Sequence, residues 1–341
     1  MLRRHRRAAA RLSHAPRRRP PAGMSLEALE PRAMLTAFNY AAGVLQLVIE
    51  EVDTALVVVA TGSNGYSVST NQTFKGTDIP GQLVGNGSSS LSITPALGLL
   101  TVVVTDAASN AALTFGTGAP GGTYDADFIV SLDDPGATAI GVTGATTFSG
   151  VHSLSASAAR ISIDAELASA SGFITLDADS GTQTVGVPAG VAISAAGAVS
   201  TSGGAIDISG RGGDSIAGDQ VGVTIQGTVK AGDDGSTFGT LTISGVGGLT
   251  TGEFGGNHGV VVDVGGTVSS SGGAMSITGA GAAVTGNEVG VVVAGLVQTA
   301  SAAGHPGDIT LEGFGGGSTA TPGSSNNYGI RIDPTGQVVT A

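Results

Sequence analysis

The chain of 341 residues contains no cysteine and no tryptophan, and aromatic residues make up only 4% of it. The absence of cysteine excludes disulfide bonds, thiol catalysis and cysteine-based zinc sites, and it leaves the redox compartment open. Charged residues are also few, at 12%. Low charge combined with 58 glycines is typical of disordered chains, but 41% of the residues are apolar and they alternate with small or polar ones. This alternation indicates a buried core.

Long hydrophobic runs are missing as well. The longest uncharged apolar runs are residues 55–60 and 97–104, which have the length of a strand and are too short to span a bilayer. We therefore predict no transmembrane segment.

Positive charge is scarce outside the N-terminal tail. Nine of the 14 basic residues lie in the first 32 positions, which leaves five basic and 24 acidic residues from position 38 onward, a net charge of 5 − 24 = −19. Such a surface repels nucleic acid, and the basic tail has no interleaved aromatic residues. We expect no nucleic-acid partner.

Two short peptide themes recur through the C-terminal half of the chain. The first is a glycine followed by a Val-x-Val or Val-x-Ile type strand, at Gly190, Gly222, Gly259, Gly290 and Gly329. The second is a glycine followed by an Ile-x-Ile type strand, at Gly172, Gly204, Gly239, Gly273 and Gly307. Copies of the second theme are 32, 35, 34 and 34 residues apart. A period of this size is typical of a solenoid.

Within each repeat the apolar residues have the period of two that marks a strand with one buried face. A third short strand is predicted at Val199, Val229, Val268, Val297 and Val338. Three strands and three corners make one turn of a right-handed parallel β-helix, so the predicted fold is all-β. We expect glycine at the corners because it adopts φ values that strain other residues.

The variable part of each repeat ends in an Asn or Asp just before the next Gly-Val strand, at Asp219, Asn257, Asn287 and Asn327. Asn and Asp tolerate left-handed backbone and form hydrogen bonds within their own turns. We interpret these residues as turn residues in register, forming a partial ladder.

The N-terminal tail carries a motif that resembles a known family. A basic, Ala- and Pro-rich stretch is followed by Leu29-Glu30-Pro31-Arg32 and then by Ala33-Met34-Leu35. This resembles the LEPR-XLL motif found on large repeat-built exported or surface proteins of planctomycete bacteria. The resemblance covers about 14 residues, and it implies an extracellular or cell-surface location but no activity. The apolar core of a standard export signal is absent after the basic stretch.

Three regions follow from these observations. Residues 1–37 are predicted to be a disordered basic targeting tail, residues 38–150 a β-rich N-terminal cap with irregular first coils, and residues 151–341 a parallel β-helix with repeats of about 31–39 residues. The body resembles, in texture, the β-helical repeats of filamentous-haemagglutinin-like adhesins. The last repeat stops before its Gly-x-Ile-x-Ile strand, so we expect the chain to be part of a longer protein or a truncated product, and to self-associate through its C-terminal edge.

One segment suggests a metal. Gly210-Arg-Gly-Gly-Asp214-Ser-Ile fits most of the calcium-binding nonapeptide of RTX proteins, in which calcium lies between tandem copies. Only one copy is present, and Ser209 replaces the first glycine. Asp214 and Asp219 are the candidate calcium ligands, with solvated turn acids as the alternative. No other cofactor is expected.

Catalysis is not expected, although many β-helices cleave polysaccharides. Aligned repeats place Asp207 in a column with Thr175, Thr242, Ser276 and Thr310, and Arg331 in a column with Ala192, Thr224, Val261 and Val292. One carboxylate and one guanidinium several coils apart do not form a catalytic cluster. The sequence therefore predicts a non-catalytic, adhesin-like structural surface protein that contacts cell-envelope or matrix components, glycans among them. The alternative is a polysaccharide-binding or polysaccharide-processing β-helix whose active coils lie outside this chain.

Overall fold

The computed structural model describes residues 35–340, except for 63–64, 95–98, 108–109, 117–121, 133–136, 179–188, 215–218, 236, 250–255, 283–286, 303, 306 and 317–325. The chain divides into two units, Met1–Ala33 and Met34–Ala341, and every described strand belongs to the second. All regular secondary structure in the described residues is β, which confirms the predicted all-β class. The basic tail and the Leu29-Glu-Pro-Arg32 motif lie outside the described residues, and Leu35 is the first residue of β1.

The strands form three sheets, which we name A, B and C. Sheet A contains β1 (Leu35–Ala41), β2 (Val44–Ile49), β5 (Thr73–Lys75), β8 (Thr101–Asp106), β11 (Asp127–Leu132), β14 (Leu154–Ala158), β17 (Ile174–Ala178), β20 (Ile206–Arg211), β23 (Leu241–Val246), β26 (Met275–Ala280) and β29 (Ile309–Phe314). Sheet B contains β3 (Ala55–Gly62), β4 (Gly65–Thr70), β6 (Leu83–Val84), β7 (Ser90–Ile93), β9 (Ala112–Phe115), β12 (Ala139–Val142), β15 (Arg160–Ile163), β18 (Ala189–Ile193), β21 (Val221–Ile225), β24 (Val260–Val262), β27 (Val291–Val293) and β30 (Ile330–Ile332). Sheet C contains β10 (Gly122–Tyr124), β13 (Thr146–Phe148), β16 (Glu166–Ser169), β19 (Ala198–Thr201), β22 (Thr228–Ala231), β25 (Thr267–Ser271), β28 (Leu296–Ala300) and β31 (Gln337–Thr340).

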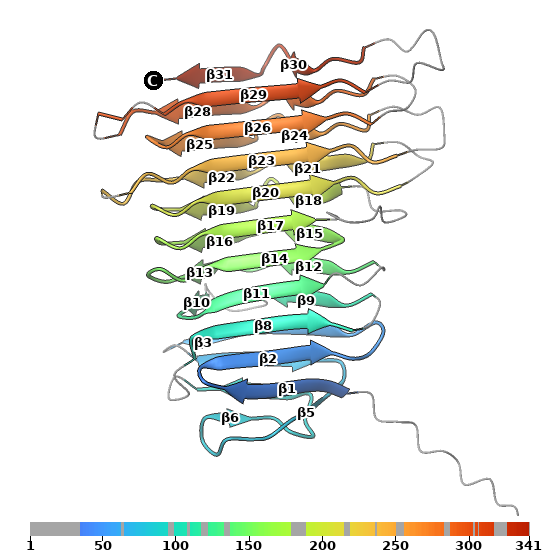
Figure 1. The fold of residues 1–341 in the computed structure, drawn as a ribbon, viewed down its shortest axis with the longest axis vertical. Helices are drawn as coiled ribbons and strands as arrows, with labels where there is room; N and C mark the ends of the chain where they lie inside the picture. Colours follow the sequence, from blue (N-terminus) through green and yellow to red (C-terminus); the bar gives the residue numbers. More distant parts are fainter. Residues whose placement is uncertain are drawn as a thin grey trace, which may run out of the picture. The chain divides into compact units, whose positions relative to one another are not determined.

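From β8 onward, consecutive strands lie in sheets A, B and C in turn, and each pairs in parallel with strands three places away in the chain (Figure 1). We name each set of three consecutive strands, one per sheet, a rung. The three strands per repeat predicted from the sequence are confirmed, and the rungs begin at β8, within residues 38–150. The arrangement is compatible with a parallel β-helix or another solenoid.

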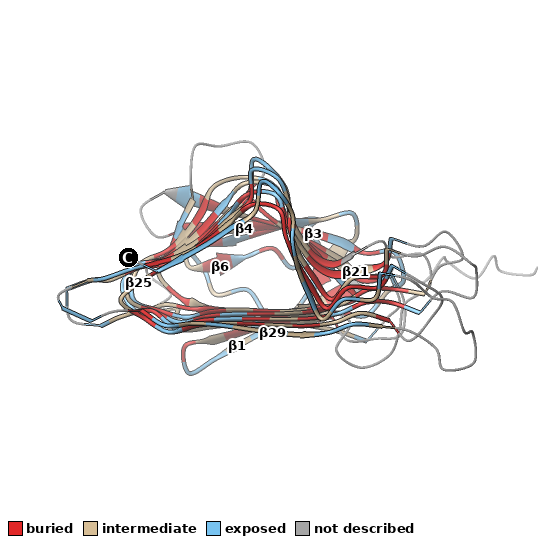
Figure 2. Cartoon of the chain, turned by 90° about the horizontal axis from the view of Figure 1, so that it is seen from above, coloured by how far each residue is buried: buried red, intermediate tan, exposed pale blue. Residues whose placement is uncertain are grey.

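Alternation along each strand separates a core face from an outer face. Three residues occupy the same position on neighbouring strands of sheet A and have buried side chains: Ile206, Leu241 and Met275. One residue further on, Asp207 and Thr242 point outward. Apolar residues from all three sheets form one hydrophobic cluster. Seen along the stack, equivalent strands of successive rungs lie over one another (Figure 2). Burial of these aliphatic columns is the main term that stabilises the stack.

The repeated glycines lie where successive rungs come closest. A Cβ added at Gly204 would lie less than 3.0 Å from the carbonyl oxygen of Gly172, and one at Gly273 would meet the carbonyl oxygen of Gly239 in the same way. The glycine that begins each Gly-Val strand is also crowded. At Gly259 a Cβ would lie less than 3.0 Å from backbone atoms of Gly245, Ala280 and Gly290. We predicted that glycine occurs at the corners because it adopts φ values that strain other residues. This reason is wrong for the repeated glycines, because none of them has a positive φ. Close approach of backbones excludes a side chain there.

Strands β1 to β7 form a different structure at the N-terminal end of this unit. β1 pairs antiparallel with β2, and β4 pairs antiparallel with both β3 and β7. β2 and β3 also pair in parallel with β8 and β9, so they join the antiparallel strands to the first rung.

Aromatic residues gather next to this antiparallel part. Tyr124 stacks on Tyr66 at a centroid distance of 5.3 Å and on Phe148 at 5.5 Å, and the rings of Phe115 and Phe128 pack edge-to-face against Tyr124. Tyr124 is fully buried, and its hydroxyl donates a hydrogen bond to the carbonyl oxygen of Val58 (3.2 Å). Burial raises the pKa of the Tyr124 hydroxyl well above its usual range, so the group is a neutral donor at any physiological pH.

Candidate functional site

Two columns of polar residues run side by side along the corner that leads from sheet A into sheet B. The first column contains the residue three positions before each repeated glycine of sheet B, and its members have positive φ: Asp219 (56°), Gly256 (94°), Asn287 (62°) and Asn326 (73°). Asn326 Nδ2 donates a hydrogen bond to Asn287 Oδ1 (3.0 Å) one rung away. The predicted turn role is confirmed for Asp219 and Asn287. It is wrong for Asn257 and Asn327, because Gly256 and Asn326 occupy that position.

The second column lies one residue further along and contains Gln220, Asn257, Glu288 and Asn327. Its asparagines connect rungs through their side chains. The backbone N–H of Gln220 donates to Asn257 Oδ1 (3.0 Å), and the backbone N–H of Glu288 donates to Asn327 Oδ1 (3.0 Å). Asn257 is fully buried, so its side chain acts as a fixed acceptor between two rungs.

Glu288 is the exception in this buried column. Its side chain is 0% exposed, and neither carboxylate oxygen has a hydrogen-bond partner. Burial away from water raises the pKa of the Glu288 carboxyl above its ordinary value of 4.5. The folded protein therefore favours the protonated acid at this position.

Replacement of Glu288 by glutamine is expected to stabilise the protein, and the gain should grow with pH. Because the pKa of Glu288 is raised in the folded protein, the contribution of this side chain to stability is fully present below pH 4.5. That contribution is lost as the pH rises through the folded pKa. Glu288→Gln keeps the shape of the side chain without the charge, so we expect a higher unfolding free energy than wild type at pH 7 and little difference at pH 4. Urea unfolding across pH 4–8 measures it. Glu50→Gln, at an exposed position, controls for the change in net charge. A constant difference between wild type and Glu288→Gln at every pH would contradict the assignment.

His258 lies beside the same corner and is held neutral. Its Nδ1 accepts a hydrogen bond from the backbone N–H of Val289 (3.1 Å), which fixes the proton on the other ring nitrogen. Burial, followed by the positive charge of Arg331, lowers the pKa of His258 to about 4, against smaller opposing effects of Asp219 and Asp333. His258 thus contributes to hydrogen bonding between rungs.

The two candidate calcium ligands flank the loop between β20 and β21. Asp214 follows β20, and Asp219 is the left-handed residue just before β21, with residues 215–218 between them outside the described part of the chain. Among the described residues no group of three or more His, Asp or Glu side chains is placed to hold a metal ion. Asp214 and Asp219 thus remain a predicted pair of calcium ligands.

The outer face of sheet A carries two columns of hydroxyl and carboxylate side chains. The register confirms the column predicted from the sequence, Thr175, Asp207, Thr242, Ser276 and Thr310, and extends it to Ser155. Asp177 and Ser209 belong to the second column, and Ser209 Oγ donates a hydrogen bond to Asp177 Oδ1 (2.6 Å). Burial, followed by the negative charge of Asp177, raises the pKa of the Asp207 carboxyl. The register of sheet B likewise confirms the column that ends at Arg331. Asp207 and Arg331 therefore lie on different sheets.

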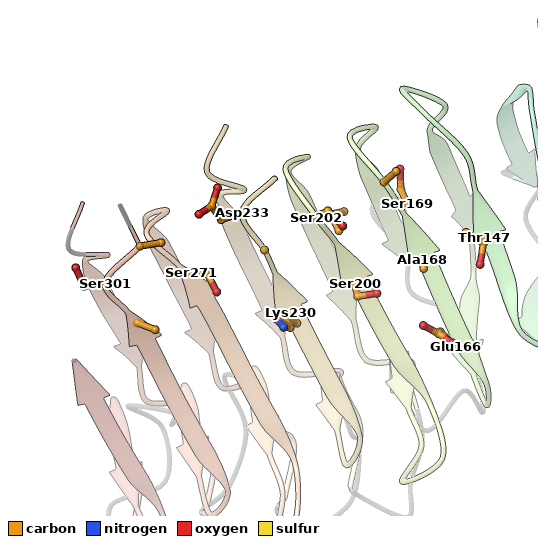
Figure 3. A pocket seen from close by; sticks show the side chains of 15 residues that line it. Thr147, Glu166, Ala168, Ser169, Ser200, Ser202, Lys230, Asp233, Ser271 and Ser301 are labelled. Carbon is orange, nitrogen blue, oxygen red and sulfur yellow. The ribbon is translucent and has the colours of Figure 1, made fainter. Parts of the chain in front are cut away.

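A groove follows the outer face of sheet C across six strands, β13, β16, β19, β22, β25 and β28. It has a volume of about 610 Å³, and its lining is mostly Ser, Thr and Ala with three charged side chains, Glu166, Lys230 and Asp233 (Figure 3). The sequence analysis missed this groove. No motif marks it, because its lining comes from residues that lie a full repeat apart.

Two corner loops form one wall of the groove. The loop after β22 folds back through a bridge between Asp233 and Phe238, and the loop after β28 through a bridge between Ala302 and His305. The Phe238 and His305 rings contact each other at a centroid distance of 4.5 Å. The Ser171 hydroxyl also donates to Asp234 Oδ2 (3.2 Å) across 63 residues of chain. These contacts fix both loops beside the sheet, so the groove is largely preformed.

No family model matches the chain, and no curated protein or solved structure is significantly similar to it. The described residues contain no helix long and apolar enough to cross a membrane.

Proposed function

We propose that this chain is a non-catalytic, exported surface protein in which a right-handed parallel β-helix carries recognition surfaces on its outer faces and corner loops. The observation that supports this best is the stack of three parallel sheets with polar columns on their outer faces. A scaffold of this kind presents extended surfaces on which a partner can be recognised.

The proposed extracellular or cell-surface location rests on the tail. The basic stretch followed by Leu29-Glu30-Pro31-Arg32 and Leu35 resembles the LEPR-XLL motif, and the strongly acidic body suits a protein that remains soluble outside the cell. The cell envelope, the extracellular matrix and their glycans are the proposed partners.

A reporter fusion tests this location. Residues 1–37 fused to a fluorescent reporter should deliver it to the envelope or the medium of a planctomycete host. The matched control replaces residues 29–32 with four alanines and should leave the reporter in the cytoplasm. A cytoplasmic reporter with the native tail would contradict the proposal.

Self-association is proposed for the chain of 341 residues. In the described part of the chain β29, β30 and β31 each have a strand neighbour on one side only, and apolar residues such as Ile332 and Val338 are exposed there. Exposed strand edges with apolar side chains pair readily with a second copy.

Replacement of Val338 by lysine is expected to weaken this association. An unpaired ammonium in the contact costs more than about 1.4 kcal/mol, so the dissociation constant should rise at least about tenfold. Light scattering over a concentration series measures the effect. Thr242→Lys places the same charge on the outer face of sheet A and should change little. Unchanged association of Val338→Lys would move the contact to another surface.

A further inference from the structure

The groove over sheet C has the chemistry of a surface that hydrogen-bonds a hydroxyl-rich ligand. Its floor is a column of outward residues that includes Thr147, Ala168, Ser200 and Lys230, one from each successive rung. Hydroxyls both donate and accept hydrogen bonds, and Lys230 adds a cationic donor. In Figure 3 the side chains of Ser200 and Lys230 lie on neighbouring strands, with Asp233 and Ser202 toward the corner loops.

The two carboxylates extend this pattern. Glu166 lies on β16 at one end of the groove, and Asp233 lies on the wall after β22. An ionised carboxylate has two acceptor oxygens and can accept from two neighbouring hydroxyls of one ligand at once. Carboxylates, hydroxyls and one ammonium group can together form hydrogen bonds with a ligand that is rich in both donors and acceptors.

The dimensions of the groove favour a chain over a compact molecule. It crosses six strands of sheet C, and strands in a sheet are about 4.8 Å apart, so it extends over about 24 Å. Three small residues of the lining, Ala168, Ala170 and Gly232, let a ligand lie close to the backbone. Among the described residues no aromatic or large aliphatic side chain lines it, so an apolar ligand or the side chains of a peptide would find no anchor there.

The charge of the groove selects against polyanions. Its lining carries one basic and two acidic side chains, and the body from position 38 onward has a net charge of −19. An anionic glycan or nucleic acid would approach against this field. An uncharged ligand approaches without electrostatic repulsion.

We propose that this groove binds an uncharged polysaccharide in an extended conformation, with Lys230, Glu166 and Asp233 as its principal hydrogen-bonding groups. The inference deepens the proposed function, because it assigns one recognition surface and one class of ligand to the exported scaffold. The binding test below uses purified protein, so its result does not depend on where the cell delivers the chain.

The test measures binding of the purified 341-residue chain to defined polysaccharides by affinity electrophoresis and calorimetry. Laminarin, xylan, mannan and dextran are the uncharged probes, alginate and polygalacturonate the anionic ones, and polylysine the cationic peptide. At least one uncharged probe should bind, and it should bind more tightly than the anionic probes and polylysine. Failure of all four uncharged probes with folded protein, or tighter binding of a charged probe, would overturn the proposal.

Two variants locate the site. Ser200→Tyr places a large side chain on the floor and should abolish measurable binding, and Lys230→Ala removes the cationic donor and should weaken binding about tenfold. Each has a matched control. Ser244→Tyr makes the same change on the outer face of sheet A, and Lys75→Ala removes the other lysine of the described body, which is exposed on β5. Both controls should bind as wild type. Wild-type affinity in Ser200→Tyr would place the binding elsewhere and refute the assignment.

Discussion

Replacement of Phe128 by alanine is expected to lower the free energy of unfolding by about 3–5 kcal/mol, because it removes the central ring of a buried aromatic cluster. Phe128 is 1% exposed, and its ring edges pack against Tyr66, Phe115, Tyr124 and Phe148 with centroid distances of 5.2–6.0 Å. Such aromatic pairs contribute about 0.5–1.5 kcal/mol beyond their area burial.

Urea unfolding followed by circular dichroism measures this loss. Phe173→Ala is the matched control, because Phe173 is 50% exposed and should cost less than about 1 kcal/mol. The cluster lies where the antiparallel strands meet the first rungs, so its loss should affect the N-terminal rungs first. Equal losses for the two variants would show that the aromatic cluster contributes no special stability.

The second large effect is expected from Gly204→Ala, which should lower the free energy of unfolding by about 3 kcal/mol. A methyl group at this position would overlap the carbonyl oxygen of Gly172 in the preceding rung. The atoms that it would meet belong to the backbone of Ser171 and Gly172, which cannot rotate away as a side chain can, so the two rungs must separate locally and lengthen their ladder hydrogen bonds.

Gly141→Ala is the control for this second prediction. A Cβ at Gly141 would lie 3.5 Å from Ser162 Oγ and 3.8 Å from Thr114 Oγ1, which are ordinary contacts, and its φ is not positive. This variant should be neutral or gain up to about 1 kcal/mol through the unfolded state. If Gly204→Ala is as stable as Gly141→Ala, the close approach of the rungs is not what requires glycine.

The periodic part of the fold was predictable from the sequence because each rung repeats the same constraints. The Ile-x-Ile strands became sheet A, the Gly-Val strands sheet B and the short Val strands sheet C, with the register that aligned repeats imply. The position of the repeated glycines was also predictable. Their physical reason was not, because crowding between rungs depends on backbone separations that a one-dimensional pattern does not contain.

The antiparallel strands β1 to β7 and the aromatic cluster were less accessible to sequence reasoning. They occur once, so no alignment of repeats reinforces the signal, and β3 with β4 pairs through a hairpin that a solenoid pattern does not predict. The groove over sheet C was hidden for a related reason. It depends on the lengths of the loops after β22 and β28, which vary from rung to rung.

The corner columns show a signal that was present and misread by one position. Gln220, Asn257, Glu288 and Asn327 all lie two residues before a repeated glycine of sheet B, so counting back from that glycine separates them from the left-handed residues. Selection by residue type instead mixed the two columns. The calcium prediction for Asp214 and Asp219 stays a prediction, because part of the loop that joins them lies outside the described residues.

The identical register of successive rungs also determines how such a gene can change length. Leu241 and Met275 occupy the same position in sheet A, so a deletion of residues 241–274 would join Thr240 to Met275 and remove β23, β24 and β25 together. β26 would then face β20, β27 would face β21 and β28 would face β22, with every inward residue still inward. Insertions and deletions of a whole rung are therefore tolerated by the ladders, whereas a one-residue change within a strand reverses which side chains face the core.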